Sequence, residues 1–323
     1  MKRNDRHIKL LLLGLVFFVI AALGAGTWYM LSQTPAVLQT AGDIGHKERS
    51  LIYFSLALSL LVVIPVFIML GHIAWKYRAS NTNAKYQPNW DRNNRIEAAW
   101  WLIPTILIAI LSVVTWQSSH SLDPYRPLSS KEKPVEVQVV SLQWKWLFIY
   151  PKEGIATVNY LQVPVDTPIN FTLTSDAPMN SFWIPQLGGQ IYTMPGMSTQ
   201  LHLIADRQGT YHGASANISG DGFAGMRFDT KAVSKDAYVQ WVAVTRQKDL
   251  ALTMATYKQL ALPSSNEPVR LYGKAQKGLF NDIIMQHMGT ESSPATPKSP
   301  NTPQPTSHDY DMHDDMNMEG MME

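Results

Sequence analysis

The sequence of 323 residues contains no cysteine. Disulfide bridges, iron–sulfur clusters, thiolate zinc sites and thiolate copper sites are therefore excluded. The chain also lacks a large charge of one sign, because 27 basic and 25 acidic side chains leave a formal net charge of +2. A charge this small does not predict nucleic-acid binding, and we expect no nucleic-acid partner.

The apolar residues gather in three long runs near the start of the chain. The first run follows several basic residues, so residues 1–31 are expected to be a signal peptide or an uncleaved signal anchor. The other two cover residues 51–75 and 97–117, and each is close to the roughly 20 residues that cross a bilayer. We therefore expect a pair of membrane-spanning helices within residues 42–119.

The connecting loop, residues 76–96, is rich in Lys and Arg. The positive-inside rule places such a loop in the cytoplasm, and the basic N-terminus gives the first run a matching orientation. Everything after residue 117 then lies outside, in a bacterial periplasm or its equivalent. The sequence thus predicts a multi-pass protein of the bacterial cell inner membrane with a periplasmic C-terminal domain.

Short segments of alternating or β-rich composition follow the apolar runs. Pro, Gly, Asn and Asp separate these segments at intervals of about 8–12 residues, which favours an antiparallel sandwich or barrel. We assign residues 120–232 to this all-β domain. The clearest expected strands cover residues 135–140, 143–150, 155–163, 169–175, 200–205 and 210–215.

The remainder of the chain changes character twice. Residues 233–290 favour a helical appendix that packs on the β-domain or on a partner. Its expected apolar faces are Ala237, Trp241, Val242 and Val244 on one helix, and Leu279, Ile283, Ile284 and Met288 on another. Residues 291–323 form a Pro-rich and then His/Met-rich tail, which we expect to be disordered. Because imidazole and thioether groups suit copper, a membrane copper-delivery protein that uses this tail is one alternative hypothesis.

Several segments resemble subunit II of the haem-copper oxidases. They are the aromatic residues 144–151, the Ser-Phe-Trp segment of residues 180–188, the Pro-Gly-Met of residues 195–197, and the loop of residues 211–226. The resemblance covers about residues 42–288. It implies a membrane α-helical hairpin followed by a cupredoxin-like Greek-key sandwich. The segments 75–81, 85–90, 142–151 and 154–159 are most similar to the cytochrome bo-type ubiquinol oxidase branch.

In copper-bearing members of this family, two Cys, two His, one Met and a Glu carbonyl hold a dinuclear copper centre. A serine hydroxyl is hard and neutral, so it cannot replace a bridging thiolate for copper. We therefore expect no metal and no cofactor in this chain. Met226 alone keeps its family identity, and we expect it to pack in the core. The corresponding positions here are Asn180, Ser215, Asn217, Ser219, Phe223 and Met226.

The resemblance implies a non-redox subunit of a proton-pumping complex that oxidises ubiquinol and reduces O2 to water in aerobic respiration. The haems and copper are expected in the partner, subunit I. The other expected partners are the smaller membrane subunits of the same complex and the lipid bilayer. No catalytic residue is expected here; the chain would cap subunit I and support assembly. A copper-bearing cytochrome c oxidase subunit II is a disfavoured alternative. Many members of the branch carry a lipid-modified cysteine, and this sequence departs from them there.

Glu97 stands at the start of the third apolar run and has two interpretations. It is an acid at a helix N-terminus, where the macrodipole favours negative charge. Alternatively it takes up protons, as acids at membrane interfaces often do. The resemblance supports the second interpretation, because a family glutamate at this place lies at the mouth of a proton channel into subunit I.

We expect structural roles for two further groups of side chains. Trp144 and Trp146 have no copper centre to serve, so we expect them to be interface aromatics that pack beside subunit I. His120, His202 and His212 show no metal-ligand spacing with one another, and we expect all three to be structural.

Overall fold

The computed structural model describes residues 18, 21–22, 24–29, 32, 35–83 and 93–288. Those described between residues 18 and 32 are helical. Three of the predictions concern segments that lie wholly or largely outside the described residues. They are the cleavage or anchoring of the first apolar run, the position of part of the basic loop, and the disorder of the Pro-rich and His/Met-rich tail.

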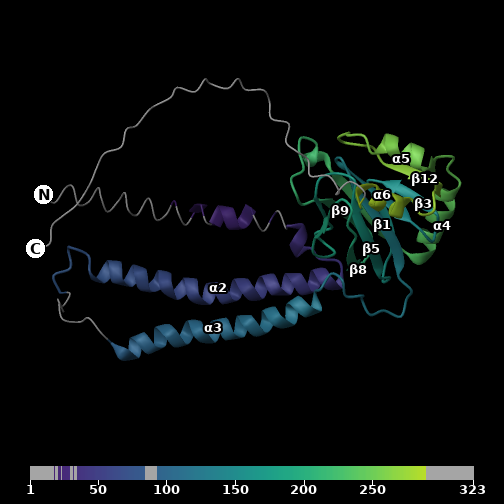
Figure 1. Cartoon of the computed structure of the whole chain (residues 1–323). Helices are drawn as coiled ribbons and strands as arrows, with labels where there is room; N and C mark the ends of the chain where they lie inside the picture. Colours follow the sequence, from purple (N-terminus) through teal and green to yellow (C-terminus); the bar gives the residue numbers. More distant parts are fainter. Residues whose placement is uncertain are drawn as a thin grey trace, which may run out of the picture. The chain divides into compact units, whose positions relative to one another are not determined.

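Two long helices, drawn in Figure 1, take the place of the second and third apolar runs: α2 is Asp43–Lys76 and α3 is Asn94–Ser121. Both are long and apolar enough to cross a membrane. Each begins before its apolar run. For α3 the reason is a cap, because the Asn93 side chain accepts hydrogen bonds from the N–H groups of Arg95 and Ile96 at 3.1 and 3.2 Å.

The first turn of α2 is held by the β-domain. The short 3-10 helix η1 (Ala36–Leu38) precedes it. The N–H of Gly45 then donates to the Leu187 carbonyl at 3.0 Å. At Gly42 a side chain has no room, since a Cβ would lie 2.2 Å from the carbonyl oxygen of Ile204. His46 adds a 2.6 Å contact between its Nε2 and Asp206. Polar tertiary contacts therefore extend this helix beyond what the apolar run predicts.

The β-domain is built from two main sheets. The six-stranded sheet has the order β12-β3-β2-β1-β5-β8, and the five-stranded sheet has the order β4-β10-β9-β6-β7. The strands of the first are β1 (Val135–Leu142), β2 (Lys145–Tyr150), β3 (Ile155–Val158), β5 (Ile169–Ser175), β8 (Thr199–Leu203) and β12 (Arg270–Tyr272). Those of the second are β4 (Tyr160–Pro164), β6 (Asn180–Trp183), β7 (Ile191–Thr193), β9 (Gly209–Ser215) and β10 (Arg227–Val233).

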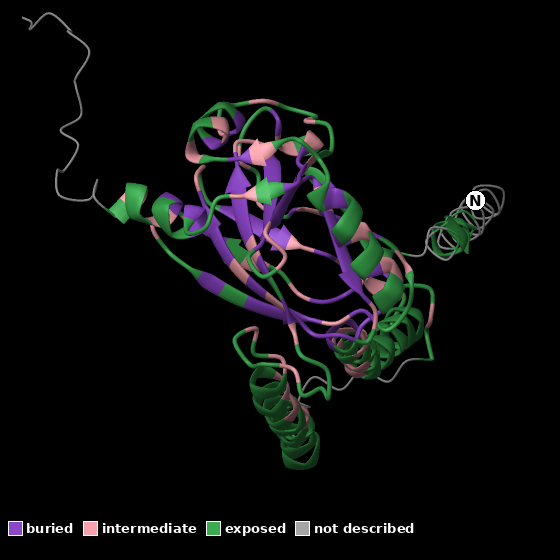
Figure 2. Ribbon diagram, turned by 90° about the vertical axis from the view of Figure 1, so that its right-hand side faces the viewer, coloured by how far each residue is buried: buried purple, intermediate pink, exposed green. Residues whose placement is uncertain are grey.

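The main core lies between these two sheets, and Figure 2 shows the strands of the domain as its mostly buried part. Aromatic rings fill its centre. Phe182 and Phe228 stack with their centroids 5.1 Å apart, and Trp146 meets Phe182 edge-on at 5.3 Å. Burial of large aromatic surfaces of this kind supplies much of the free energy that holds two sheets together.

A second core covers the outer face of the six-stranded sheet. It is formed by α5 (Met254–Leu260) and α6 (Leu279–Met288), whose Tyr257, Phe280 and Ile283 are buried among residues of β1, β2 and β3. Because both faces of the sheet are covered there, every residue of β2 is buried. This strand therefore shows no alternation of buried and exposed positions.

The expected purely antiparallel pairing is wrong at two places. Strand β1 pairs in parallel with β5, and β4 pairs in parallel with β10. The single strand predicted over residues 155–163 is also two strands. Asn159, with φ of 55°, turns the chain so that β3 and β4 join different sheets. Strands β6, β7 and β10 were not predicted, although β10 has alternating burial along most of its length.

The expected helical appendix contains strands as well as helices. Its strand β12 pairs with β3 and so extends the six-stranded sheet, while β11 (Ala251–Leu252) and β13 (Lys274–Ala275) form a small parallel pair. The appendix is thus continuous with the β-domain.

The predicted apolar faces of the appendix are partly wrong. In α4 (Lys235–Arg246) the buried positions are Tyr238, Val242 and Thr245, whereas Val244 is 57% exposed. These three residues follow the spacing of one helical face, which Val244 does not share. In α6 the buried residues are Leu279, Phe280 and Ile283, and Met288 is exposed.

Candidate functional site

Two of the predicted copper-ligand positions lie side by side. Asn180 opens β6 and Ser215 closes β9, and the two strands are antiparallel neighbours. The hydroxyl of Ser215 donates to Oδ1 of Asn180 at 3.0 Å, and the Asn180 amide donates to the Pro178 carbonyl at 2.8 Å. Both side chains are buried, so each satisfies its polar atoms within the protein.

The loop after β9 carries the remaining positions. The Asn217 amide donates to the Met179 carbonyl at 2.8 Å. Phe223 starts the short 3-10 helix η2 (Phe223–Gly225) and is half-buried. Met226 is fully buried in the main core, where it is surrounded by apolar side chains. The Ser219 hydroxyl is buried and has no hydrogen-bond partner among the described residues.

The chemistry of this donor set does not fit the dinuclear copper centre. Neutral hydroxyl and amide groups replace the thiolates and one imidazole, and the Asn180 and Ser215 side chains are hydrogen-bonded to each other. Soft copper requires thiolate, thioether or imidazole ligands. Among the described residues there is also no group of three or more His, Asp or Glu side chains that could hold a metal ion.

Trp144 packs against the same loop. It has a φ of 64°, and its indole N–H donates to the Ser219 carbonyl at 3.2 Å. The ring lies directly against Gly222, where a Cβ would come within 2.3 Å of it. Glycine is therefore required at position 222, and Trp144 stabilises the conformation of the loop.

The position of Trp146 contradicts the prediction that this side chain packs beside subunit I. The side chain is fully buried between the two sheets, in contact with Phe182 and Phe228. A residue with no exposed surface cannot pack beside another subunit, so an interface role for Trp146 is wrong. Lys145 and Trp146 are neighbours in strand β2, so their side chains point to opposite faces of the sheet, whereas Trp144 lies in the turn before the strand.

The three histidines lie apart from one another. Nδ1 of His202 is 2.8 Å from Oδ1 of Asn170, and Nδ1 of His212 is 2.7 Å from a carboxylate oxygen of Asp229. His120 contacts the backbone of its own helix. Each ring thus has a separate polar partner, which is compatible with the structural roles expected for them.

We expect His202 to make the stability of the β-domain depend on acid pH. Burial lowers the pKa of His202 below its ordinary value of 6.5. The unfolded chain then binds a proton more readily than the folded one, so stability falls as the pH drops below about 6.5. The variant His202→Gln should flatten this part of the curve of thermal midpoint against pH. An unchanged slope between about pH 7 and about pH 5 would contradict the expectation.

Glu97 lies in the first turn of α3, and its side chain is exposed in this chain. The opposite end of α3, at Ser121, leads into the β-domain. The helix between them is about 36 Å long at 1.5 Å per residue, more than the roughly 30 Å of a bilayer core. If α3 spans a membrane, Glu97 and the β-domain are on opposite sides.

Lys145 is a buried charge that the sequence patterns do not predict. The residue is 1% exposed, and its ammonium donates to the carbonyls of Leu260 and Leu262, both at 2.8 Å. A third hydrogen bond reaches the Ser264 hydroxyl at 2.5 Å. Burial lowers the pKa of Lys145, an effect that nearby Glu267 opposes. No sequence motif marks this lysine, because its partners lie more than a hundred residues further along the chain.

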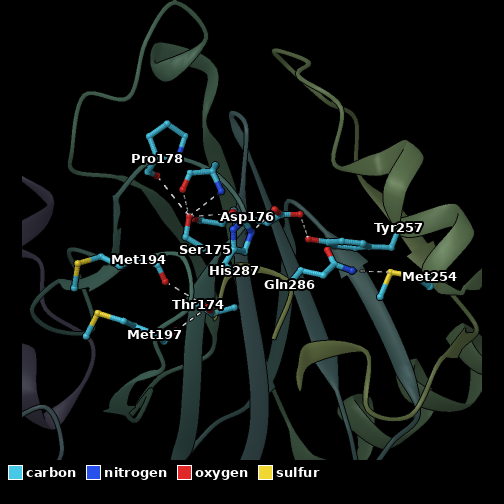
Figure 3. A network of polar contacts seen from close by, with 12 residues as sticks. Thr174, Ser175, Asp176, Pro178, Met194, Met197, Met254, Tyr257, Gln286 and His287 are labelled. Carbon is cyan, nitrogen blue, oxygen red and sulfur yellow. Dashed lines mark hydrogen bonds and ion pairs between the residues drawn. The ribbon is translucent and has the colours of Figure 1, made fainter. Parts of the chain in front are cut away.

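A second polar anchor, shown in Figure 3, centres on Asp176. The Tyr257 hydroxyl donates to one carboxylate oxygen at 2.5 Å, and Nε2 of His287 lies 2.7 Å from the other. Burial raises the pKa of the Tyr257 phenol, and the carboxylate raises it further. Asp176 therefore connects α5 and α6 to the end of β5, four residues before Asn180.

Two parts of the chain match described protein families. Residues 152–233 match the family described as "Cytochrome C oxidase subunit II, periplasmic domain", and residues 246–291 match the "COX Aromatic Rich Motif". The solved periplasmic domain of subunit II of cytochrome oxidase from Bradyrhizobium japonicum is 20% identical, with a TM-score of 0.35, covering 37% of this chain and 96% of that one.

Two relatives are similar over most of their length. The "Cytochrome bo(3) ubiquinol oxidase subunit 2" of Pseudomonas aeruginosa is 53% identical over 246 residues, or 76% of this chain and 74% of the relative. The "Ubiquinol oxidase subunit 2" of Acetobacter aceti is 49% identical over 253 residues, or 78% and 82%. The resemblance and the cupredoxin-like sandwich behind two apolar helices are thereby confirmed. The chain belongs to the subunit 2 family of the cytochrome bo(3)-type ubiquinol oxidases.

Proposed function

We propose that the chain is a non-redox subunit of a proton-pumping complex that oxidises ubiquinol and reduces O2 to water. The observation that carries this proposal is the state of the former copper site. The β-domain keeps the fold, while hydrogen-bonded Asn180 and Ser215 occupy two ligand positions. Electrons then reach the haems and copper of subunit I without passing through this chain, whose work is assembly and capping of that subunit.

The proposed placement is a multi-pass inner-membrane protein with the β-domain in the periplasm. The two long apolar helices support it, as do the basic residues between them, which the positive-inside rule assigns to the cytoplasm. In this placement α2 and α3 contact subunit I and the smaller membrane subunits, and Glu97 lies on the cytoplasmic side.

A donor assay on the purified complex tests the proposal. The full chain, carrying an affinity tag, should co-purify with a haem-containing subunit. The complex should consume O2 with ubiquinol as electron donor and not with reduced cytochrome c. Turnover with reduced cytochrome c, or copper that is retained by the isolated chain and takes part in that turnover, would contradict the proposal.

We further propose that Glu97 takes up protons for subunit I. The variant Glu97→Gln keeps the size and the helix position but cannot ionise, so we expect turnover with ubiquinol to fall about tenfold, a rise of about 1.4 kcal/mol in the barrier. The matched variant Glu97→Asp should retain much of the activity. Haem content and co-purification should be the same in both. Normal turnover in Glu97→Gln would refute this role.

A further inference from the structure

A cavity of about 510 Å³ lies where the helix pair meets the β-domain. Its walls come from four parts of the chain. The start of α2 contributes Lys47 and Glu48, the segment after α3 contributes Asp123 and Arg126, the segment before β7 contributes Gly189 and Gln190, and β8 contributes His202. The cavity is thus placed at the level of the lipid head groups on the side of the β-domain, if the helices span a membrane as proposed.

An apolar groove of about 390 Å³ continues from this cavity between the two helices. Leu51 lies on its α2 side and Leu111 and Val114 on its α3 side, while Leu122, Asp123 and Pro124 line both spaces. From residue 111 to residue 122 the helix rises about 16 Å. This is about half of the roughly 30 Å hydrocarbon core of a bilayer, or one leaflet.

The charges of the cavity are of both signs. Lys47 is occupied by Asp43, with Nζ 2.6 Å from the carboxylate. Arg126 differs, because the only hydrogen bond from its guanidinium to the described residues reaches the His120 carbonyl at 3.4 Å. Besides Asp43, two carboxylates share the cavity with this guanidinium. Glu48 already accepts a hydrogen bond from the backbone of Gly189, and Asp123 accepts one from the N–H of Tyr125 at 2.9 Å, so each has acceptor capacity left for a further donor. The cavity can therefore serve an anionic and a cationic group of one ligand.

We propose that the cavity and groove bind one zwitterionic phospholipid whose head group carries a primary ammonium. The phosphate pairs with Arg126, the ammonium donates to Glu48 and Asp123, and one acyl chain fills the groove beside Val114. A purely anionic head group would bring negative charge to two carboxylates, and a quaternary ammonium could not donate hydrogen bonds to them. The inference rests on the proposed membrane placement of α2 and α3.

Lipid competition on the intact complex tests this proposal. The complex is exchanged into micelles that contain equal amounts of phosphatidylethanolamine, phosphatidylcholine and phosphatidylglycerol, and retained lipid is counted by native mass spectrometry. We expect phosphatidylethanolamine to be retained preferentially. The variant Arg126→Gln should weaken its binding about tenfold, as expected for one lost hydrogen bond to a charged group. Lys133→Gln removes the same charge from an exposed site outside the cavity and should change nothing.

Three results would overturn the proposal. They are unchanged retention in Arg126→Gln, preferential retention of phosphatidylglycerol, and displacement of the lipid by inorganic phosphate, which would mark a simple anion site. A second variant, Val114→Trp, fills the groove without altering charge. It should release the lipid while the other subunits still co-purify. If it instead expels the other subunits, the groove is a protein contact and the lipid assignment is wrong. Co-purification of the unmodified chain reports separately on the proposed function.

Discussion

Replacing Lys145 by methionine is expected to destabilise the β-domain by about 3 kcal/mol, the loss of charged hydrogen bonds without full compensation. The ammonium is buried and donates to two backbone carbonyls and one hydroxyl at the end of α5 and in the segment that follows it. Methionine fills a similar volume, but it leaves these acceptors without a donor. For a domain of this size the thermal midpoint should fall by about 6–12 °C.

The loss should begin in the segment that Lys145 anchors. Amide hydrogen exchange of the full chain should show residues 254–264 losing protection before strands β1 and β5 do, because local opening follows the weakest contacts. Lys152→Met is the matched control. It removes an exposed lysine that pairs with Glu136 at the surface, and such pairs contribute about 0–1 kcal/mol. Equal midpoints for the two variants would show that the buried ammonium adds no stability.

Restoring the missing ligands is expected to create a copper site at the end of β9 and in the loop that follows it. The scaffold is retained, since Asn180 and Ser215 already touch and Met226 follows the loop in a fixed, buried position. Two thiolates would supply the soft bridging donors that copper requires. The combined variant is Asn180→His, Ser215→Cys, Asn217→Glu, Ser219→Cys and Phe223→His.

The measurement is anaerobic copper titration followed by visible absorption. The combined variant should bind copper with an intense thiolate-to-copper band, and the unmodified chain should show none. A control carrying the histidine and glutamate changes but keeping Ser215 and Ser219 should also lack the band. Absence of copper from a folded combined variant would mean that the loop has moved away from the geometry of the family.

Much of the architecture was accessible from local patterns. Apolar runs predicted α2 and α3, but their ends depend on contacts that hydropathy does not register, such as the Asn93 cap and the docking of Gly45 on Leu187. The period-two patterns located most long strands. They failed where the backbone conformation changes sharply, as at Asn159, and where strands are as short as β6 and β7.

The candidate site, like the fold, could be predicted from the sequence only in part. The residues of the loop after β9 are close in sequence, so their departure from the copper pattern was visible in one segment. Asn180 is 35 residues before Ser215, and the pairing of β6 with β9 brings the two together. That pairing is long-range, and local composition does not specify it.

By itself, the sequence determined which ligands are absent, which segments are apolar enough to span a membrane, and to which family the chain is similar. Only the tertiary structure decided what the neighbouring residues Trp144, Lys145 and Trp146 do. Trp144 lies in the turn before β2, and the side chains of Lys145 and Trp146 point to opposite faces of that strand, so the role of each residue depends on what covers its side chain. The ligand loop covers Trp144, the segment after α5 covers Lys145, and the opposite sheet covers Trp146. Those covering elements are distant in the sequence from residues 144–146. Their position depends on tertiary packing, which no local sequence pattern specifies.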